Sequence, residues 1–203
     1  MNKFARESPL LALLCLICGL AIVLTHALLG PRIARQQLAA TQAGYLRILH
    51  IEPAPDVQLD SKPVTDDAAL LGLRSPQTIY VARRDGRVLG VVLPVTAHEG
   101  YAGDIDLLLG IDPQGKVISV QVTSEHETRD LGDKIEPRQS DWLAQFRGHS
   151  DANQTIWRLR GEGGAFDGIT GATVTSRAVI EAVRQGLTYF EEHRDEIIGK
   201  QKP

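Results

Sequence analysis

The spacing of hydrophobic positions changes several times along the chain. From Leu10 to Gly30 there are 21 consecutive residues without a formal charge, and Pro31 ends the run. A helix of about 20 residues crosses the ~30 Å hydrocarbon core of a bilayer. We therefore expect residues 1–31 to form a short cytoplasmic tail and a single transmembrane anchor.

A cleaved signal peptide is the alternative for this segment, because it also has a basic start, here Lys3 and Arg6, before an apolar run. The apolar region of a signal peptide is usually only about 7 to 15 residues long, and no convincing small-residue cleavage site follows here. A retained anchor fits better. Basic residues flank both ends of the run, so the charge pattern alone does not choose an orientation.

Two different patterns follow the anchor. Residues 32–49 carry apolar side chains near helical spacing, which predicts a juxtamembrane helix. Residues 52–67 are rich in Pro, Asp and Ser, which interrupt regular structure and predict a linker or long loop. We therefore expect residues 32–67 to be helix and linker, and residues 68–203 to form the folded domain.

The next part of the chain has the composition of β-strands. The pair Asp85-Gly86 favours a tight hairpin turn, and Asp112-Pro113-Gln114-Gly115 predicts a second turn. Each turn is flanked by segments rich in β-branched and other apolar residues. The four predicted strands are 78–83, 87–97, 104–111 and 116–123.

Helices dominate the last third. Residues 141–148 predict a short helix with Ser140 as N-cap, and residues 173–198 carry an apolar stripe at helical spacing. Hairpins followed by helices, without β-α-β alternation, predict an α+β fold. We expect an N-terminal transmembrane helix followed by an antiparallel-sheet domain with a long C-terminal helix, and not a doubly wound sheet.

The amino-acid composition limits the classes of protein to which the chain can belong. The 203 residues include 22 Lys plus Arg and 25 Asp plus Glu, a formal net charge of −3, and 43% are hydrophobic. This mix is that of a globular protein, and it lacks the basic surface of a nucleic-acid-binding protein. Cys15 and Cys18 both lie in the apolar run, where we interpret them as apolar fillers and not as a redox pair. The glycines at 161–164 fit neither a dinucleotide nor a P-loop fingerprint.

The candidate chemistry lies directly before the last predicted helix, in residues 167–179 (DGITGATVTSRAV). A helix start leaves backbone N–H groups unpaired and carries partial positive charge, so it binds anions, and Gly171 and Ala172 leave room for a phosphate. The alternative is that the hydroxyl residues only cap the helix, and the pattern leaves both open. The hydroxyl residues are Thr170, Thr173, Thr175 and Ser176.

The six residues 170–175, TGATVT, resemble the Ser/Thr-Gly-Ala-Thr-X-Thr motif of the FMN-binding domain family. In that family flavin mononucleotide (FMN) is esterified through its phosphate to the last threonine. The resemblance implies that Thr175 carries covalent FMN and is an attachment point, not a catalytic residue, and that a separate flavin transferase installs the cofactor. The other implied cofactor-binding residues are Thr170, Gly171, Ala172, Thr173 and Ser176.

Two further segments resemble the same family. Residues 100–105 (GYAGDI) resemble its Gly-Tyr-X-Gly-X-Ile segment, and residues 125–128 (EHET) resemble its HxET loop. Relatives commonly continue Glu-Thr-Pro-Gly-Leu-Gly, whereas residues 127–132 read ETRDLG. The missing Pro-Gly turn changes the geometry expected of this loop, and one outcome is that Arg129 lies near a carboxylate or the flavin.

Other side chains near these motifs have simpler interpretations. His126 lies between Glu125 and Glu127, but adjacent residues of an extended segment point to opposite sides, so we expect no metal site. Trp142 and Trp157 could stack on a flavin, although core packing is the commoner role of such rings.

The anchor, the length and the motifs together resemble the G subunits of Rnf-type (Rsx) ion-translocating electron-transport complexes, over residues 5–200. This resemblance implies a single-pass subunit of the bacterial inner membrane, with its soluble domain and covalent FMN on the periplasmic side. It would pass electrons within a complex with the A, B, C, D and E subunits, as part of a translocase and not as a complete enzyme. Two alternatives stay open: a subunit like NqrC of sodium-pumping quinone reductases, or a module that binds a phosphorylated ligand non-covalently.

Overall fold

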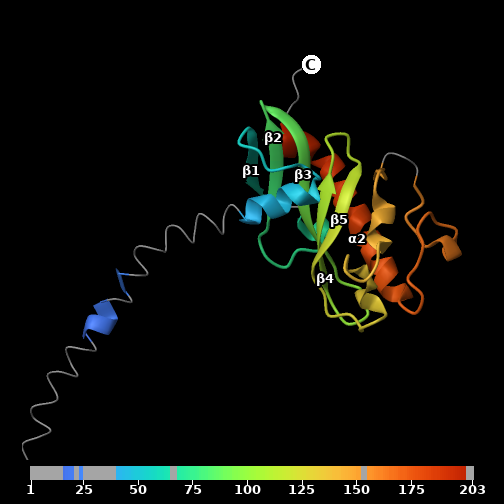
Figure 1. The fold of residues 1–203 in the computed structure, drawn as a ribbon. Coiled ribbons are helices and arrows are strands. Elements are labelled where there is room, and N and C mark those ends of the chain that lie inside the picture. The colour runs from blue at the N-terminus through green and yellow to red at the C-terminus, as the bar shows by residue number, and fades with distance from the viewer. Residues whose placement is uncertain (1–15, 21–22, 25–39, 65–67, 152–154, 200–203) are drawn as a thin grey trace, which may run out of the picture. The chain divides into compact units, whose positions relative to one another are not determined.

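A computed structural model of the chain describes residues 16–20, 23–24, 40–64, 68–151 and 155–199 (Figure 1). The chain divides into two units, Met1–Ala43 and Gly44–Pro203, and the second holds the folded domain. In the described residues we find no helix that is both long and apolar enough to span a membrane. Most of the predicted anchor lies outside those residues, although 16–20 and 23–24 are helical.

Five strands form one antiparallel sheet whose spatial order follows the sequence. Both predicted hairpins are confirmed, and at the first turn Asp85 and Gly86 have φ angles of 51° and 78°, the left-handed conformations that a tight hairpin turn requires. The strands are β1 (Val57–Pro63), β2 (Thr78–Arg84), β3 (Arg87–Ala97), β4 (Ile105–Ile111) and β5 (Val117–Ser124).

The prediction of a linker over residues 52–67 is wrong for its central part, because Val57–Pro63 is strand β1. It pairs with β2 from Val57 opposite Arg84 to Pro63 opposite Thr78. As an edge strand β1 buries little, so its polar composition is compatible with a strand, and Pro63 stands at its end, where a missing N–H is tolerated.

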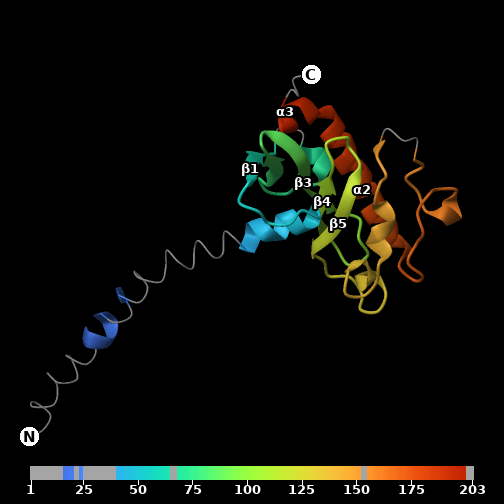
Figure 2. The same cartoon turned by 45° about the horizontal axis from the view of Figure 1, so that its top comes forward.

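The sheet separates two hydrophobic cores, because neighbouring residues of a strand face opposite sides. Val91 contributes to the larger core, under helix α2 (Thr173–Glu192), whereas Val92 contributes to a smaller core on the other face. The smaller core includes Leu46, Ile48 and Leu49. Figures 1 and 2 show α2 running along one face of the sheet.

The helical predictions differ from the structure in their details. Residues 40–48 are helical, whereas 32–39 of the predicted juxtamembrane helix lie outside the described residues. The predicted helix at 173–198 is two helices, because the chain turns at His193 (ψ 15°) and thereby buries both isoleucines of the second helix. The remaining helices are η1 (Ala68–Leu71), η2 (Gly132–Ile135), η3 (Trp142–Phe146), η5 (Arg160–Glu162) and α3 (Arg194–Ile198).

The short helix expected at 141–148 is the 3₁₀ helix η3, which is shorter than predicted. The N-cap residue of η3 is Asp141 and not the predicted Ser140, although the Ser140 hydroxyl accepts a hydrogen bond from the backbone N–H of Trp142 at 3.2 Å. The same hydroxyl donates to the carbonyl of Lys134 and so joins η3 to the end of η2.

Candidate functional site

A pocket of about 380 Å³ is formed by three segments that are far apart in the sequence. They are the connection between β3 and β4, the segment after β5, and the start of α2, which carry the three motifs found in the sequence. The residues that line the pocket are Tyr101, Glu127, Thr128, Leu131, Gly132, Gly171, Ala172, Thr173, Val174 and Thr175.

The register of β4 and β5 explains why two of these segments meet. Asp106 near the start of β4 pairs with Ser124 at the end of β5. The residues before β4 and the residues after β5 therefore leave the sheet at the same end of these two strands. The next pair is Leu107 with Val122, which makes Thr123 the extra residue of a β-bulge. The two segments are joined directly, since the N–H of Ala102 donates to Glu127 Oε1 at 3.0 Å.

The start of α2 is joined to the same carboxylate. Thr175, the third residue of α2, has an exposed fraction of 0%, and its Oγ1 donates a hydrogen bond to Glu127 Oε2 at 2.6 Å. Glu127 itself is only 9% exposed. Both oxygens of this carboxylate are therefore used, one by each of the segments that flank it.

The Glu127 side chain fits in its position only because two neighbouring residues, Gly100 and Gly132, have no side chain. A Cβ atom on Gly132 would lie 2.7 Å from both Cβ and Oε2 of Glu127. A Cβ on Gly100 would lie 2.8 Å from Glu127 Oε1 and 2.2 Å from the carbonyl oxygen of Gly103. These distances are too short for real contacts, so any side chain at either position would displace the carboxylate or the backbone around it.

The hydroxyl groups at the start of α2 do not all have the same role. Ser176 is buried and its Oγ donates to the carbonyl of Ala172 and accepts from the N–H of Ile169, both at 2.9 Å, so it stabilises the turn itself. Thr170 and Thr173 are exposed, and of these two Thr173 lines the pocket. Thr175 is the buried hydroxyl at this turn that is bonded to an acidic side chain.

Simple capping does not account for this turn. The N-cap residue of α2 is Ala172, and within the described part of the chain it makes no side-chain capping bond. The first backbone N–H groups of α2 therefore stay available to a ligand, as the anion-site interpretation requires. Gly171, directly before the N-cap, has a φ angle of 82° and also lines the pocket.

The loop that departs from the family pattern keeps a tight turn. The carbonyl of Thr128 accepts hydrogen bonds from the N–H groups of Leu131 (3.2 Å) and Gly132 (3.0 Å). Asp130 has a φ angle of 62°, the conformation that glycine adopts without cost, and it stands where relatives commonly have glycine. Arg129 is exposed and makes no ion pair with any described residue, so the expected contact with a carboxylate is not observed.

The walls of the pocket are mainly apolar. Tyr101, Leu131 and Val174 are 73%, 40% and 44% exposed, although large apolar side chains are usually buried. These side chains surround an opening whose inner end carries Thr175 and the first turn of α2. Apolar walls beside free N–H groups suit a ligand with a flat apolar ring system at one end and a phosphate at the other.

The two tryptophans lie elsewhere. Trp157 stacks on Phe166 with ring centroids 4.8 Å apart, and Trp142 packs edge-on against Phe146 at 5.4 Å. Trp142 Nε1 also donates to the carbonyl of Asp167 at 2.7 Å. Both tryptophans pack against the larger core, and neither is among the described residues that line the pocket, so core packing is their role.

A charged cluster joins the two ends of the β3–β4 connection, because His98 directly follows β3 and Asp104 directly precedes β4. His98 Nδ1 lies 3.0 Å from Asp104 Oδ1, and Arg74 lies 2.8 Å from Asp104 Oδ2. The hydrogen bond from His98, together with the charge of Arg74, lowers the pKa of Asp104 below its usual value. Asp104 therefore stays ionised and ties the connection to the chain before β2.

Sequence reasoning did not identify Glu127, Tyr101, Leu131 or Gly132 as site residues. Glu127 and Tyr101 do belong to the motifs EHET and GYAGDI, so treating every residue of a matched motif as a site candidate would have found them. Leu131 and Gly132 belong to the departing loop ETRDLG and carry no such signal on their own.

Comparisons with known proteins agree with this geometry. The model of the FMN-binding domain family matches residues 100–188, a range that contains all three pocket segments. The chain is 37% identical over 203 residues to the G subunit of the ion-translocating oxidoreductase complex of Pseudomonas aeruginosa, covering 99% of this chain and 95% of that protein. It is 36% identical over 197 residues to the G subunit of the same complex of Pectobacterium atrosepticum, covering 94% and 92%.

A solved structure resembles the fold as well. The crystal structure of Shewanella oneidensis NqrC superposes with a TM-score of 0.57 and covers 78% of this chain and 96% of that one, at 16% sequence identity. At this identity the likeness concerns the fold alone, whereas the similarity to the two G subunits extends over nearly the full length of both chains. The chain therefore belongs to the family of G subunits of ion-translocating oxidoreductase complexes and contains that family's FMN-binding domain.

Proposed function

We propose that this chain is an electron-transfer subunit that carries FMN esterified to Thr175, within an Rnf-type complex that couples electron transfer to ion translocation. The observation that carries the proposal is the meeting of TGATVT, GYAGDI and EHET at one pocket, with the Thr175 hydroxyl at its inner end. In such a complex the chain is one subunit of a translocase and not a complete enzyme.

The residues of the pocket fit FMN. The first-turn N–H groups of α2 would hold the phosphate, and Tyr101, Leu131 and Val174 would contact the ring system. When bound, the flavin supplies the redox chemistry. The protein keeps it at a fixed position, and an ester bond prevents its dissociation between electron transfers.

The burial of Thr175 adds one requirement to this proposal. An exposed fraction of 0% means that phosphorus does not reach Oγ1 unless side chains around the pocket move. The exposed rim residues Leu131 and Tyr101 are the ones whose movement costs least, because little packs over them. A separate flavin transferase would act on this opened form.

The placement in the cell is part of the same proposal. The uncharged run over residues 10–30 supports a single inner-membrane anchor in residues 1–31, with the folded domain that follows it on the periplasmic side. The partners would be the A, B, C, D and E subunits of the complex. Reporter fusions after residue 31 test this placement, and a cytoplasmic reporter signal would contradict it.

The decisive experiment measures covalent flavin. Full-length chain made in a host with a flavin transferase is denatured, and flavin fluorescence on a gel and the intact mass are recorded. We expect the mass to exceed that of the polypeptide by one FMN less one water. Thr175→Val is expected to abolish both signals, whereas the control Thr173→Val, at an exposed position two residues away, retains the ester.

The same experiment separates the alternatives. A module that binds a phosphorylated ligand non-covalently would lose all flavin on denaturation, with no gain in mass. Loss of the ester in Thr173→Val but not in Thr175→Val would move the attachment point. An NqrC-like subunit would also be flavinylated, but the match over 95% of the Pseudomonas aeruginosa G subunit favours the Rnf-type complex.

A further inference from the structure

We propose that Glu127 is the base of the attachment reaction, accepting the proton of Thr175 as the phosphoester forms. This inference rests on the proposed covalent attachment and assigns a role that the attachment motif itself does not contain. Glu127 lies 48 residues before Thr175 in the sequence, yet its Oε2 already accepts the hydroxyl proton at 2.6 Å. A base within hydrogen-bond distance of the proton that it removes is the first requirement of general base catalysis.

The charge of the pocket argues against a phosphate-holding role for Glu127. Among the described residues that line the pocket there is no Lys, Arg or His, and Glu127 is the only acidic one. A carboxylate next to a phosphate repels it, so a site built only to hold the phosphate would place a cation or a neutral donor there. Removal of the Thr175 proton, in contrast, requires an acceptor of this kind.

The surrounding structure holds the carboxylate toward Thr175. Oε1 is fixed by the N–H of Ala102, which leaves Oε2 for the hydroxyl. The N–H of Glu127 donates to the side chain of Glu125, which fixes the backbone at the same position. Gly100 and Gly132 lie so close to the carboxylate that a larger residue at either would displace it. A group placed this closely by three segments is a preorganised one.

The reaction can be written with all atoms accounted for. The co-substrate is a flavin dinucleotide, FAD, bound by the transferase. Oγ1 of Thr175 attacks the phosphorus on the FMN side of the diphosphate, the Oγ1–P bond forms, and the P–O bond to AMP breaks with its electron pair leaving on AMP. The Thr175 proton moves to Glu127 Oε2, and nothing is oxidised or reduced.

The test uses the full-length chain, FAD and a flavin transferase, and follows the rate of mass gain. Removing a general base slows a reaction by about 10²- to 10⁴-fold, and we expect that range for Glu127→Gln, which keeps the size of the side chain and an acceptor oxygen. The matched control is Glu99→Gln, an exposed acid in the β3–β4 connection outside the pocket, which should react at the wild-type rate.

A second variant separates proton transfer from a structural role. Glu127→Ala leaves space for a small carboxylate, so added formate should raise its attachment rate by about 10-fold or more if a base is what is missing. Formate does not repair a misplaced loop. Circular dichroism and thermal unfolding of each variant confirm that it is folded before its rate is compared.

Each outcome has one meaning. No mass gain in the wild-type chain would contradict the proposed function itself. A wild-type chain that gains FMN while Glu127→Gln gains it equally fast would overturn the role of Glu127 and leave the proposed function intact. A folded Glu127→Ala that formate does not rescue would also overturn the role, because the carboxylate would then only position Thr175.

Discussion

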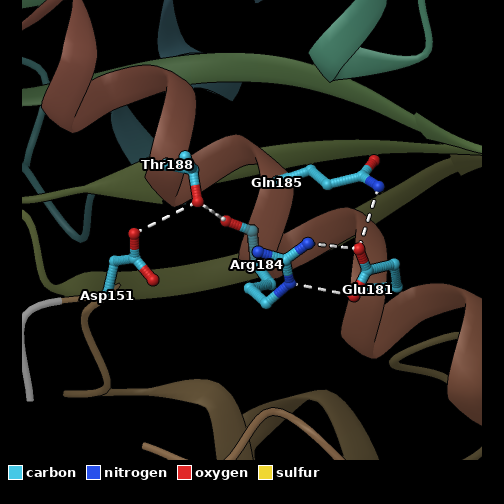
Figure 3. Close-up of polar contacts among 5 residues, drawn as sticks. All are labelled: Asp151, Glu181, Arg184, Gln185 and Thr188. Atoms are coloured by element: carbon cyan, nitrogen blue, oxygen red, sulfur yellow. Dashed lines mark hydrogen bonds and ion pairs between the residues drawn. The ribbon is translucent and has the colours of Figure 1, made fainter. Parts of the chain in front are cut away.

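Helix α2 carries two polar clusters that differ in how they depend on the fold. At its first turn Thr175 is fully buried and bonds to Glu127, which comes from a loop 48 residues away. About two turns later Glu181 bonds to residues of its own helix, with its side chain 45% exposed and that of Arg184 38% exposed (Figure 3). The members of this second cluster are Asp151, Glu181, Arg184, Gln185 and Thr188.

The comparison shows which polar contacts form only when the whole domain is folded. The partners of Glu181 lie three and four residues later on the same helix, so the pairs form wherever the helix forms. The Glu127–Thr175 bond forms only when the sheet register, two loops and the helix start are all in place. Breaking a buried bond leaves an oxygen without a partner, which costs about 1–3 kcal/mol, whereas exposed pairs contribute about 0–1 kcal/mol.

The largest effect is expected from crowding the buried pair. In Gly132→Ala the new Cβ would meet Glu127 Cβ and Oε2 at 2.7 Å, so the carboxylate must move away from Thr175. We expect the free energy of unfolding to fall by about 1–3 kcal/mol, together with a slower attachment of flavin. Urea unfolding followed by circular dichroism measures the first effect, and the rate of mass gain measures the second.

The control for this change is Gly161→Ala, a glycine of η5 whose added Cβ has no described atom within 4 Å. It should alter the free energy of unfolding by less than about 0.5 kcal/mol. Equal losses in both variants would show that the space beside Glu127 is not special.

A smaller, stabilising effect is expected from the loop that carries the buried pair. Asp130 has a φ angle of 62°, and a left-handed conformation costs a residue with a Cβ about 1–2 kcal/mol. Asp130→Gly should therefore raise the free energy of unfolding. The gain is limited to about 1 kcal/mol, because the greater conformational entropy of glycine in the unfolded chain offsets part of it. Asp141→Gly, where φ is −88°, should lower it and serves as the control in the same thermal unfolding series.

The smallest effect is expected in the exposed cluster. The hydrogen bond from Arg184 lowers the pKa of Glu181 below its ordinary value of 4.5. A lowered folded-state pKa stabilises the fold above the unfolded value, and this contribution is lost as the pH falls through the folded value. Because both side chains are well exposed, Arg184→Gln should cost no more than about 0.5 kcal/mol at pH 7.

Measurements of stability at several pH values check the direction of this pH dependence. The difference in free energy of unfolding between wild type and Arg184→Gln should be largest at pH 7 and should shrink as the pH falls through the lowered folded-state pKa of Glu181. A difference that grows on acidification would contradict the assigned cause of the pKa shift.

Much of the fold could be predicted from periodicity, because a half-buried sheet and an amphipathic helix repeat their side chains regularly. The four strands from β2 to β5 and the helix start at Thr173 are examples. Strand β1 could not be predicted in this way, since an edge strand such as Val57–Pro63 is defined by its pairing with β2 and not by burial. The break at His193 was also missed, because the apolar stripe continues through it.

The site could be predicted only in part. The pattern of residues 167–179 allows either an anion-binding turn or simple helix capping, and only the family resemblance singles out Thr175. Periodicity does not reveal which of four hydroxyls faces a carboxylate, because that depends on a contact across 48 residues. Thr175 bonds to Glu127, whereas its neighbour Ser176 bonds to its own turn. Only the three-dimensional structure distinguishes these two roles.

The bulge at Thr123 shows how the sheet constrains this chemistry at a distance. One additional residue on a strand reverses the side to which each following residue points. The bulge lies four positions before Glu127, outside the pocket, and determines how the end of β5 and the loop that follows leave the sheet. Deleting Thr123 would remove the bulge and shift the start of that loop by one residue, which would misplace the carboxylate relative to its hydroxyl, although every residue of the attachment motif would still be present.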